Sequence, residues 1–111
     1  MESNPFKKEG VPHGYLTVWQ VGAGVTGDVD SVNASAERSV QVEGEFDEAI
    51  VVIEGSNDGI NYHTINSTAG VRLEFRVTGL EAIAEITRFL RPRVLGGGAA
   101  TQLTIAVLVR M

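Results

Sequence analysis

The chain has 111 residues, of which 43% are hydrophobic. It contains nine basic residues, fourteen acidic residues and no cysteine. This length fits one domain with a single core, and the formal net charge of −5 argues against a nucleic-acid-binding protein, because phosphate contacts need clustered lysine and arginine. The lack of cysteine excludes disulfides, thiolate zinc sites and thiol catalysis. A polar N-terminus and the lack of a long apolar run predict a soluble protein with neither a signal peptide nor a membrane span.

The first segment, Met1–Gly14, carries charges, two prolines and two glycines but no periodicity. We expect an extended N-terminal arm over residues 1–14, followed by a single β-sandwich domain over residues 15–111. Two interpretations of the arm stay open. It is either a frayed terminus or an arm that orders on a neighbouring subunit, with Phe6 as its anchor and Lys7 and Lys8 beside it.

The next segments alternate between apolar and polar residues, which is typical of strands with one wet face. Tyr15–Val21 is such a strand, and Trp19 is expected in the core, with an exposed stacking platform as the alternative. Arg38–Phe46 alternates in the same way. Between them, Gly22–Ser31 has a G-x-G-x-x-G spacing, but no convincing helix follows, so we interpret it as a turn rather than a nucleotide site.

The central segment Ala49–Ile65 predicts a β-hairpin. It opens with the β-branched run Ile50–Ile53, which suits a strand covered on both faces. Asp58 and Gly59 form a strong turn signal, because glycine accepts a positive φ without steric cost and aspartate tolerates it. Tyr62–Ile65 then resumes an extended pattern.

The C-terminal part predicts further strands. Val71–Val77 shows the cleanest alternation of the chain. In Thr78–Leu95 a helix and a strand over Glu85–Val94 both fit the pattern, and we favour the strand. Gly96–Gly98 predicts a turn, and Thr101–Arg110 a final buried strand. In the segment Val71–Val77, the apolar face would consist of Val71, Leu73, Phe75 and Val77.

Seven or eight short strands, with turn signals every eight to twelve residues, predict an all-β fold, an antiparallel β-sandwich or jelly roll. No arrangement typical of a catalytic centre is present: the two histidines, His13 and His63, lie apart in the sequence, and no nucleophile elbow or His-Glu-x-x-His motif occurs. We therefore expect neither an enzyme nor a cofactor. Asp28 and Asp30 are weak candidates for a calcium site, but we predict no metal.

Three arginines near the C-terminus stand out. On a strand, Arg91 and Arg93 would share one face, spaced to meet carboxylates on a partner or on a neighbouring strand. The alternative is a sheet edge kept soluble by charge. The candidate interface residues are Phe6, Lys7, Lys8, Arg88, Arg91 and Arg93.

Three segments carry a resemblance to a known family: Val40–Phe46 (V-x-V-x-G-x-F), Ile53–Tyr62 (IEGSNDGINY) and Phe89–Gly97 (FLRPRVLGG), followed by a Leu-Thr-Ile-rich last strand. Together they resemble the small β-sandwich structural proteins of tailed bacteriophages, and most of all the head decoration (cement) proteins. The resemblance covers Ser39–Val109.

The resemblance implies a structural virion protein that binds the outer surface of a phage capsid and stabilises its lattice. Its partners would be the major capsid protein and further copies of itself, with a trimer favoured over a dimer, and neither nucleic acid nor a membrane. Its location would be the capsid surface, after assembly in the host cytoplasm. The alternatives are a phage tail or head–tail protein, and a carbohydrate-binding β-sandwich module that stacks a sugar on Trp19 or Tyr62.

Overall fold

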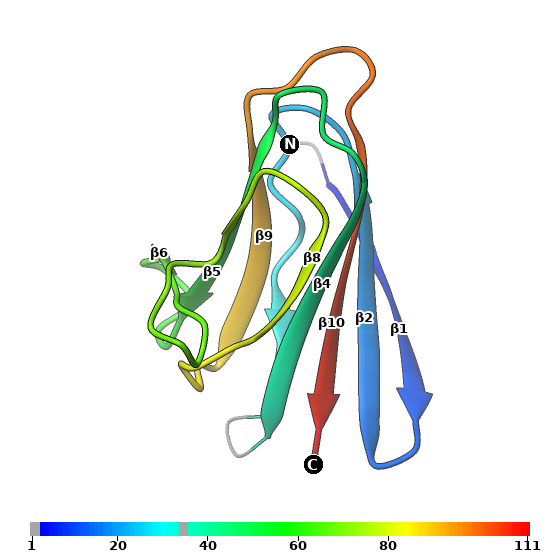
Figure 1. Cartoon of the computed structure of the whole chain (residues 1–111). Helices are drawn as coiled ribbons and strands as arrows, with labels where there is room; N and C mark the ends of the chain where they lie inside the picture. The colour runs from blue at the N-terminus through cyan, green and yellow to red at the C-terminus, as the bar shows by residue number, and fades with distance from the viewer. Residues whose placement is uncertain (1–2, 34–35) are drawn as a thin grey trace.

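The computed structural model describes residues 3–33 and 36–111, and within them the chain forms two antiparallel sheets and no helix (Figure 1). Sheet A has the strand order β1-β2-β10-β4-β8, and sheet B has the order β3-β9-β5-β6, with β7 also paired to β5. The strands are β1 (Phe6–Val11), β2 (Gly14–Val21), β3 (Asp30–Ser31), β4 (Glu37–Glu45), β5 (Ile50–Ser56), β6 (His63–Thr64), β7 (Glu74–Phe75), β8 (Gly79–Ala82), β9 (Phe89–Leu95) and β10 (Gln102–Arg110).

The two sheets pack face to face around one core to which both contribute (Figure 1). Trp19 on β2 is fully buried in this core, and its indole N–H donates to the carbonyl of Asp28 at 3.0 Å. This confirms the core interpretation of Trp19, and the alternative of an exposed stacking platform is wrong. Other fully buried side chains are Val40, Val42, Val51, Ile53, Leu90, Leu103, Ile105, Val107 and Val109.

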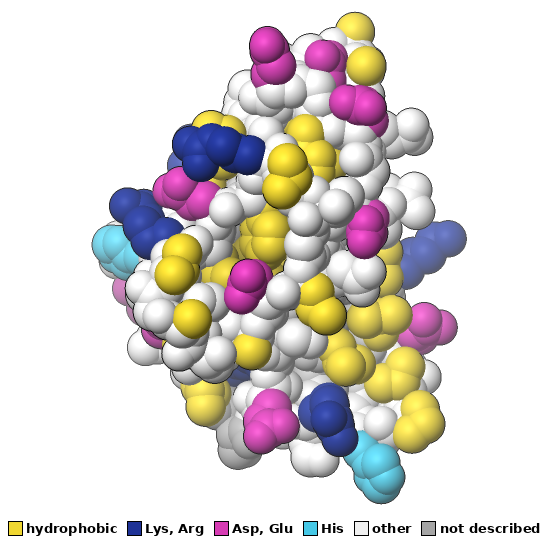
Figure 2. All heavy atoms as spheres, viewed as in Figure 1, with side chains coloured by type: hydrophobic (Ala, Val, Ile, Leu, Met, Phe, Trp, Pro, Cys, Tyr) yellow, Lys and Arg dark blue, Asp and Glu magenta, His cyan; other side chains and the backbone are white. Residues whose placement is uncertain are grey.

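The alternating segments of sheet A were predicted correctly. β2, β4 and β10 fall within a residue or two of the predicted ranges, and their alternate residues point into the core. Four of the outward positions of β2 and β10 are aliphatic and half-buried, and hydrophobic side chains gather over this part of the sheet in Figure 2. These outward residues are Leu16, Val18, Ala106 and Leu108.

The predicted central hairpin is confirmed. β5 and β6 pair antiparallel, with Glu54 opposite Thr64, and β5 is buried on both faces from its second residue on. Residues 57–62 form a longer loop than the two-residue turn that Asp58 and Gly59 suggested, although Gly59 does adopt the expected positive φ of 75°. The glycine turn after β9 is also confirmed, since Gly96 and Gly97 both have positive φ.

The prediction for Val71–Val77 is wrong in its extent. Only the two residues of β7 pair as a strand, and Val71 and Val77 are 64% and 71% exposed. The segment arches from sheet B to sheet A, so only its middle residues reach the core. The helix considered for Thr78–Leu95 does not form: this stretch contains β8 and, from residue 89, the favoured strand as β9.

The structure corrects the expectation of an arm over residues 1–14. Met1 and Glu2 lie outside the described residues, but Phe6–Val11 is strand β1, paired with β2 along its whole length. The physical reason is that alternate side chains of this charged segment find partners inside. Phe6 packs edge-on against Trp19, with ring centroids 5.4 Å apart, and Lys8 reaches the buried carboxylate of Asp30 at 2.7 Å.

Candidate functional site

The outer face of sheet B carries a charged cluster centred on Glu54. The register of β5 and β9 places Glu54 directly opposite Arg91, and Arg93 lies one outward position further along β9. The Arg91 Nε donates to Glu54 Oε1 at 2.8 Å, and an Arg93 guanidinium nitrogen lies 3.8 Å from Glu54 Oε2. Of the two kinds of partner predicted for these arginines, the structure supplies a carboxylate on the neighbouring strand.

Tyr62 completes this cluster. The Arg91 guanidinium carbon lies 3.9 Å from the centroid of the Tyr62 ring, which is cation–π geometry. The same guanidinium therefore contacts an aromatic face and a carboxylate, which fixes its plane. Arg91 covers one face of the Tyr62 ring in this arrangement.

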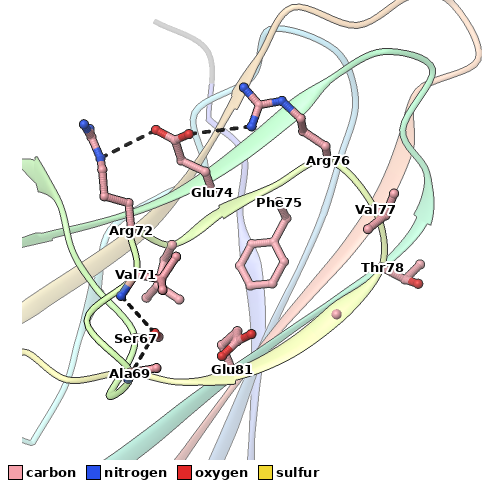
Figure 3. Close-up of a pocket in the computed structure, with 12 residues that line it drawn as sticks. Ser67, Ala69, Val71, Arg72, Glu74, Phe75, Arg76, Val77, Thr78 and Glu81 are labelled. Atoms are coloured by element: carbon pink, nitrogen blue, oxygen red, sulfur yellow. Dashed lines mark hydrogen bonds and ion pairs between the residues drawn. The ribbon is translucent and has the colours of Figure 1, made fainter.

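A second carboxylate between two arginines lies beside the first. Glu74 on β7 is opposite Val52, which is in turn opposite Arg93, so all three belong to the same row of sheet B. Glu74 accepts ion pairs from Arg72 at 3.6 Å and from Arg76 at 3.8 Å (Figure 3). We call the outer surface of sheet B that carries Arg72, Arg76, Arg91 and Arg93 the arginine face.

Next to the arginine face, the arch between β7 and β8 borders a groove of about 270 Å³. The Phe75 ring forms part of its wall, with Glu81 of β8 on the other side (Figure 3). The exposed side chains of Val71 and Val77 stand at its rim. The groove gives the arginine face an apolar border.

Arg88, the third arginine predicted as an interface residue, lies just before β9 and is exposed. Its guanidinium carbon is 5.1 Å from the centroid of the neighbouring Phe89 ring. With Arg88 included, five of the seven arginines of the chain lie on β9 and around β7. The sequence groups Arg88, Arg91 and Arg93 within six residues, whereas Arg72 and Arg76 lie twelve or more residues earlier and join them only in the folded chain.

The three N-terminal candidates lie on β1, in the other sheet. Phe6 is half-buried against Trp19, whereas Lys7 is exposed on the outer side of sheet A, opposite Val18. The Lys8 ammonium contacts the Asp30 carboxylate at 2.7 Å and lies 4.1 Å from the centroid of the Tyr15 ring. The six predicted residues therefore form two groups, one on an edge strand of sheet A and one on sheet B.

Asp30 was missed as a partner of Lys8. It is 1% exposed, and its second carboxylate oxygen accepts a hydrogen bond from the Thr17 hydroxyl at 2.8 Å. Asp28 accepts hydrogen bonds from the Ser3 hydroxyl and the Asn4 backbone N–H. All four carboxylate oxygens of Asp28 and Asp30 therefore have partners within the chain, and no group of three or more potential metal ligands occurs in the described part of the chain.

The hairpin loop holds a third notable carboxylate. Asp58 accepts hydrogen bonds from the backbone N–H groups of Asn61 and Ile60, from the Asn61 side chain and from the Ser56 hydroxyl. These donors, the Asn61 backbone first, hold the pKa of Asp58 well below its usual range. The carboxylate therefore orders the loop beside Tyr62.

Comparison with models of known protein families gave no match, and neither the curated proteins nor the solved structures gave a significant one. The described residues include no helix that is long and apolar enough to cross a membrane.

Proposed function

We propose that the protein is a structural virion protein that binds the outer surface of a phage capsid and stabilises the lattice. The proposal rests on the resemblance of Ser39–Val109 to head decoration proteins, and it includes a sandwich of jelly-roll type, a location on the virion and assembly in the host cytoplasm. The major capsid protein and further copies of this chain are the proposed partners. No catalytic step and no cofactor belong to this role.

The observation that carries the proposal is the arginine face. A chain with a net charge of −5 carries four of its seven arginines on this face, where Glu54 and Tyr62 hold Arg91 in place. Arginines held in advance lose less side-chain entropy when they meet carboxylates of a partner. Such a face suits an acidic protein surface.

The face needs no deep cavity to be effective. On a symmetric shell, each copy contributes a modest contact, and contacts between neighbouring copies add to the total through avidity. A two-sheet body is suited to this role, because Arg91 and Arg93 lie on β9, and Arg72 and Arg76 flank β7, which pairs with β5.

The test uses shells assembled from the major capsid protein of the phage that encodes this chain. The wild-type protein is expected to co-sediment with the shells and to raise the temperature at which they open. The double variant Arg72→Glu/Arg76→Glu reverses two exposed charges of the arginine face and is expected to weaken binding at least about ten-fold. Arg76→Glu alone should also weaken binding, whereas Arg110→Glu, which makes the same charge change at an exposed arginine at the end of β10, is its matched control and should bind like the wild type.

Absence of co-sedimentation by the folded wild-type protein would remove the proposal. Immunogold labelling of intact particles then separates a tail or head–tail location from a head location. If Arg76→Glu and Arg110→Glu bind equally well, the arginine face is not the contact surface.

A further inference from the structure

The four edges of the two sheets differ in how they are closed. Sheet B ends in β3 on one side and in β6 and β7 on the other, each only two residues long. On sheet A, β8 has four residues, and the segment beyond it is bridged: Ser67 pairs with Ile83, and the Thr68 N–H donates to the carbonyl of Ala82. Short and covered edges are the usual protection against pairing with another chain.

The remaining edge, β1, is neither short nor covered, and only the charges of Lys7, Lys8 and Glu9 guard it. It has six residues, four of them exposed, and within residues 3–33 and 36–111 it pairs with β2 alone. Figure 1 shows β1 as the outermost strand of sheet A. Its second edge therefore presents the backbone N–H and C=O groups that template the addition of a further strand.

We propose that β1 pairs antiparallel with β1 of a second copy, so that two copies share one continuous sheet around a twofold axis at Lys8. This inference deepens the proposed function, on which its biological meaning rests, by naming how the copies contact each other. It predicts a dimer as the basic unit, whereas the family resemblance favoured a trimer.

The side chains of β1 select this register. Lys7 and Glu9 lie opposite Val18 and Leu16, so both point to the outer face, whereas Lys8, opposite Thr17, points inward. A continuous sheet requires outward residues to lie opposite outward ones. Registers centred on Lys7 or Glu9 place identical charges opposite each other on this face, whereas the register centred on Lys8 places Lys7 opposite Glu9 twice, and opposite charges in such pairs are stabilising.

Two further features fit the same register. The two Lys8 side chains meet at the axis, but each is neutralised by the buried Asp30 of its own chain, 2.7 Å away. Phe6 lies opposite Gly10 of the second copy, and Gly10 has open space where a side chain would be. An aromatic ring covering a glycine across a strand pair stabilises sheet edges. Lys7 and Glu9 form no ion pair among the described side chains.

A single strand pair buries less surface than a standard protein interface, so the isolated dimer is expected to be weak. The experiment is therefore sedimentation equilibrium of the purified full chain at concentrations up to about 1 mM. Lys7→Glu and Glu9→Lys each place like charges opposite each other twice, and each should weaken dimerisation about ten-fold. The double variant Lys7→Glu/Glu9→Lys restores opposite charges and should return to within about three-fold of the wild type.

Glu43→Lys is the matched control for Glu9→Lys, because it makes the same charge change on the outer face of sheet A, on β4 and away from β1. Circular dichroism and thermal unfolding establish that all variants keep the fold. A wild-type protein that stays monomeric over the whole range overturns the inference, and so does a double variant as weak as the single ones. Loss of shell binding by Lys7→Glu, with a monomeric wild type, would assign the edge to the capsid protein instead.

The two proposals fail independently. Dimerisation is measured without shells, so a dimer that does not bind shells removes only the proposed function. A monomer that binds shells removes only the pairing of β1.

Discussion

Two carboxylates on the outer face of sheet B each contact two arginines but differ in how far they are buried. Glu54 and Glu74 each lie between two arginines, but the Glu54 side chain is 8% exposed and the Glu74 side chain 32%. The shortest distance is 2.8 Å from Arg91 to Glu54 and 3.6 Å from Arg72 to Glu74. The Glu54 carboxylate is therefore buried within the fold, whereas the Glu74 carboxylate and its two arginines are accessible to solvent.

The difference follows from the position of the strands. Glu54 lies on β5, the strand that pairs with β9 on one side and with β6 and β7 on the other. Glu74 lies on the two-residue β7, at the foot of the arch to sheet A. A buried carboxylate requires its partners, whereas an exposed ion pair adds little stability because water solvates both charges.

Removing the arginine that holds Glu54 should have the largest effect on this comparison. Arg91→Met leaves the buried carboxylate with only Arg93, 3.8 Å away, and should lower the free energy of unfolding by about 3 kcal/mol. Arg76→Met, the matched change at Glu74, should alter it by less than about 0.5 kcal/mol. Urea unfolding followed by tryptophan fluorescence measures both, since Trp19 is the single buried tryptophan. Equal losses in the two variants would contradict the distinction.

Neutralising the carboxylates themselves should lower the free energy of unfolding by less, and again more at Glu54 than at Glu74. Glu54→Gln keeps the volume and one acceptor oxygen but loses the charge, so we expect a loss of about 1.5 kcal/mol. Glu74→Gln should stay within about 0.5 kcal/mol of the wild type. The same urea titration decides, and a neutral Glu54→Gln would show that packing, rather than the ion pair, holds β5 and β9 together here.

Asp58 extends the comparison to a carboxylate held by uncharged donors, and its effect should be the smallest. Its folded-state pKa lies below the usual value of 3.8, so the unfolded chain takes up the proton first as the pH falls. The stability that Asp58 contributes is therefore complete above about pH 5 and is lost as the pH falls below about 4.

The measurement for Asp58 is the melting temperature of the wild type and of Asp58→Asn across this range. The wild type should melt at a higher temperature near neutral pH, and the difference should shrink in acid. A difference that does not depend on pH would assign the loop's stability to the shape of the side chain instead of its charge.

The alternation of apolar and polar residues predicted those strands that have one face toward the core and one toward solvent. β2, β4 and β10 are of this kind, because one side of each faces the core throughout. Val71–Val77 has the same alternation but crosses between sheets, and no local signal reports such a crossing. The strand β1 was not predicted, because its charged residues give no apolar alternation, although Phe6 and Lys8 both face inward.

Only part of the candidate site could be predicted from the sequence. The shared face of Arg91 and Arg93 follows from the period of a strand. Their partner Glu54 does not, because it depends on the pairing of β5 with β9, which are 37 residues apart at this contact. Arg72 and Arg76 join the same face only through β7, a strand that pairing with β5 defines and that sequence alone placed in a longer element.

The most direct measurement of the proposed role is a cryo-electron microscopy reconstruction of particles of the phage that encodes this chain. We expect density for the two-sheet body on the outside of the head, with Arg72, Arg76, Arg91 and Arg93 facing acidic side chains of the capsid protein. Density for the chain in the tail alone, or on the head with the arginine face turned to solvent, would contradict it.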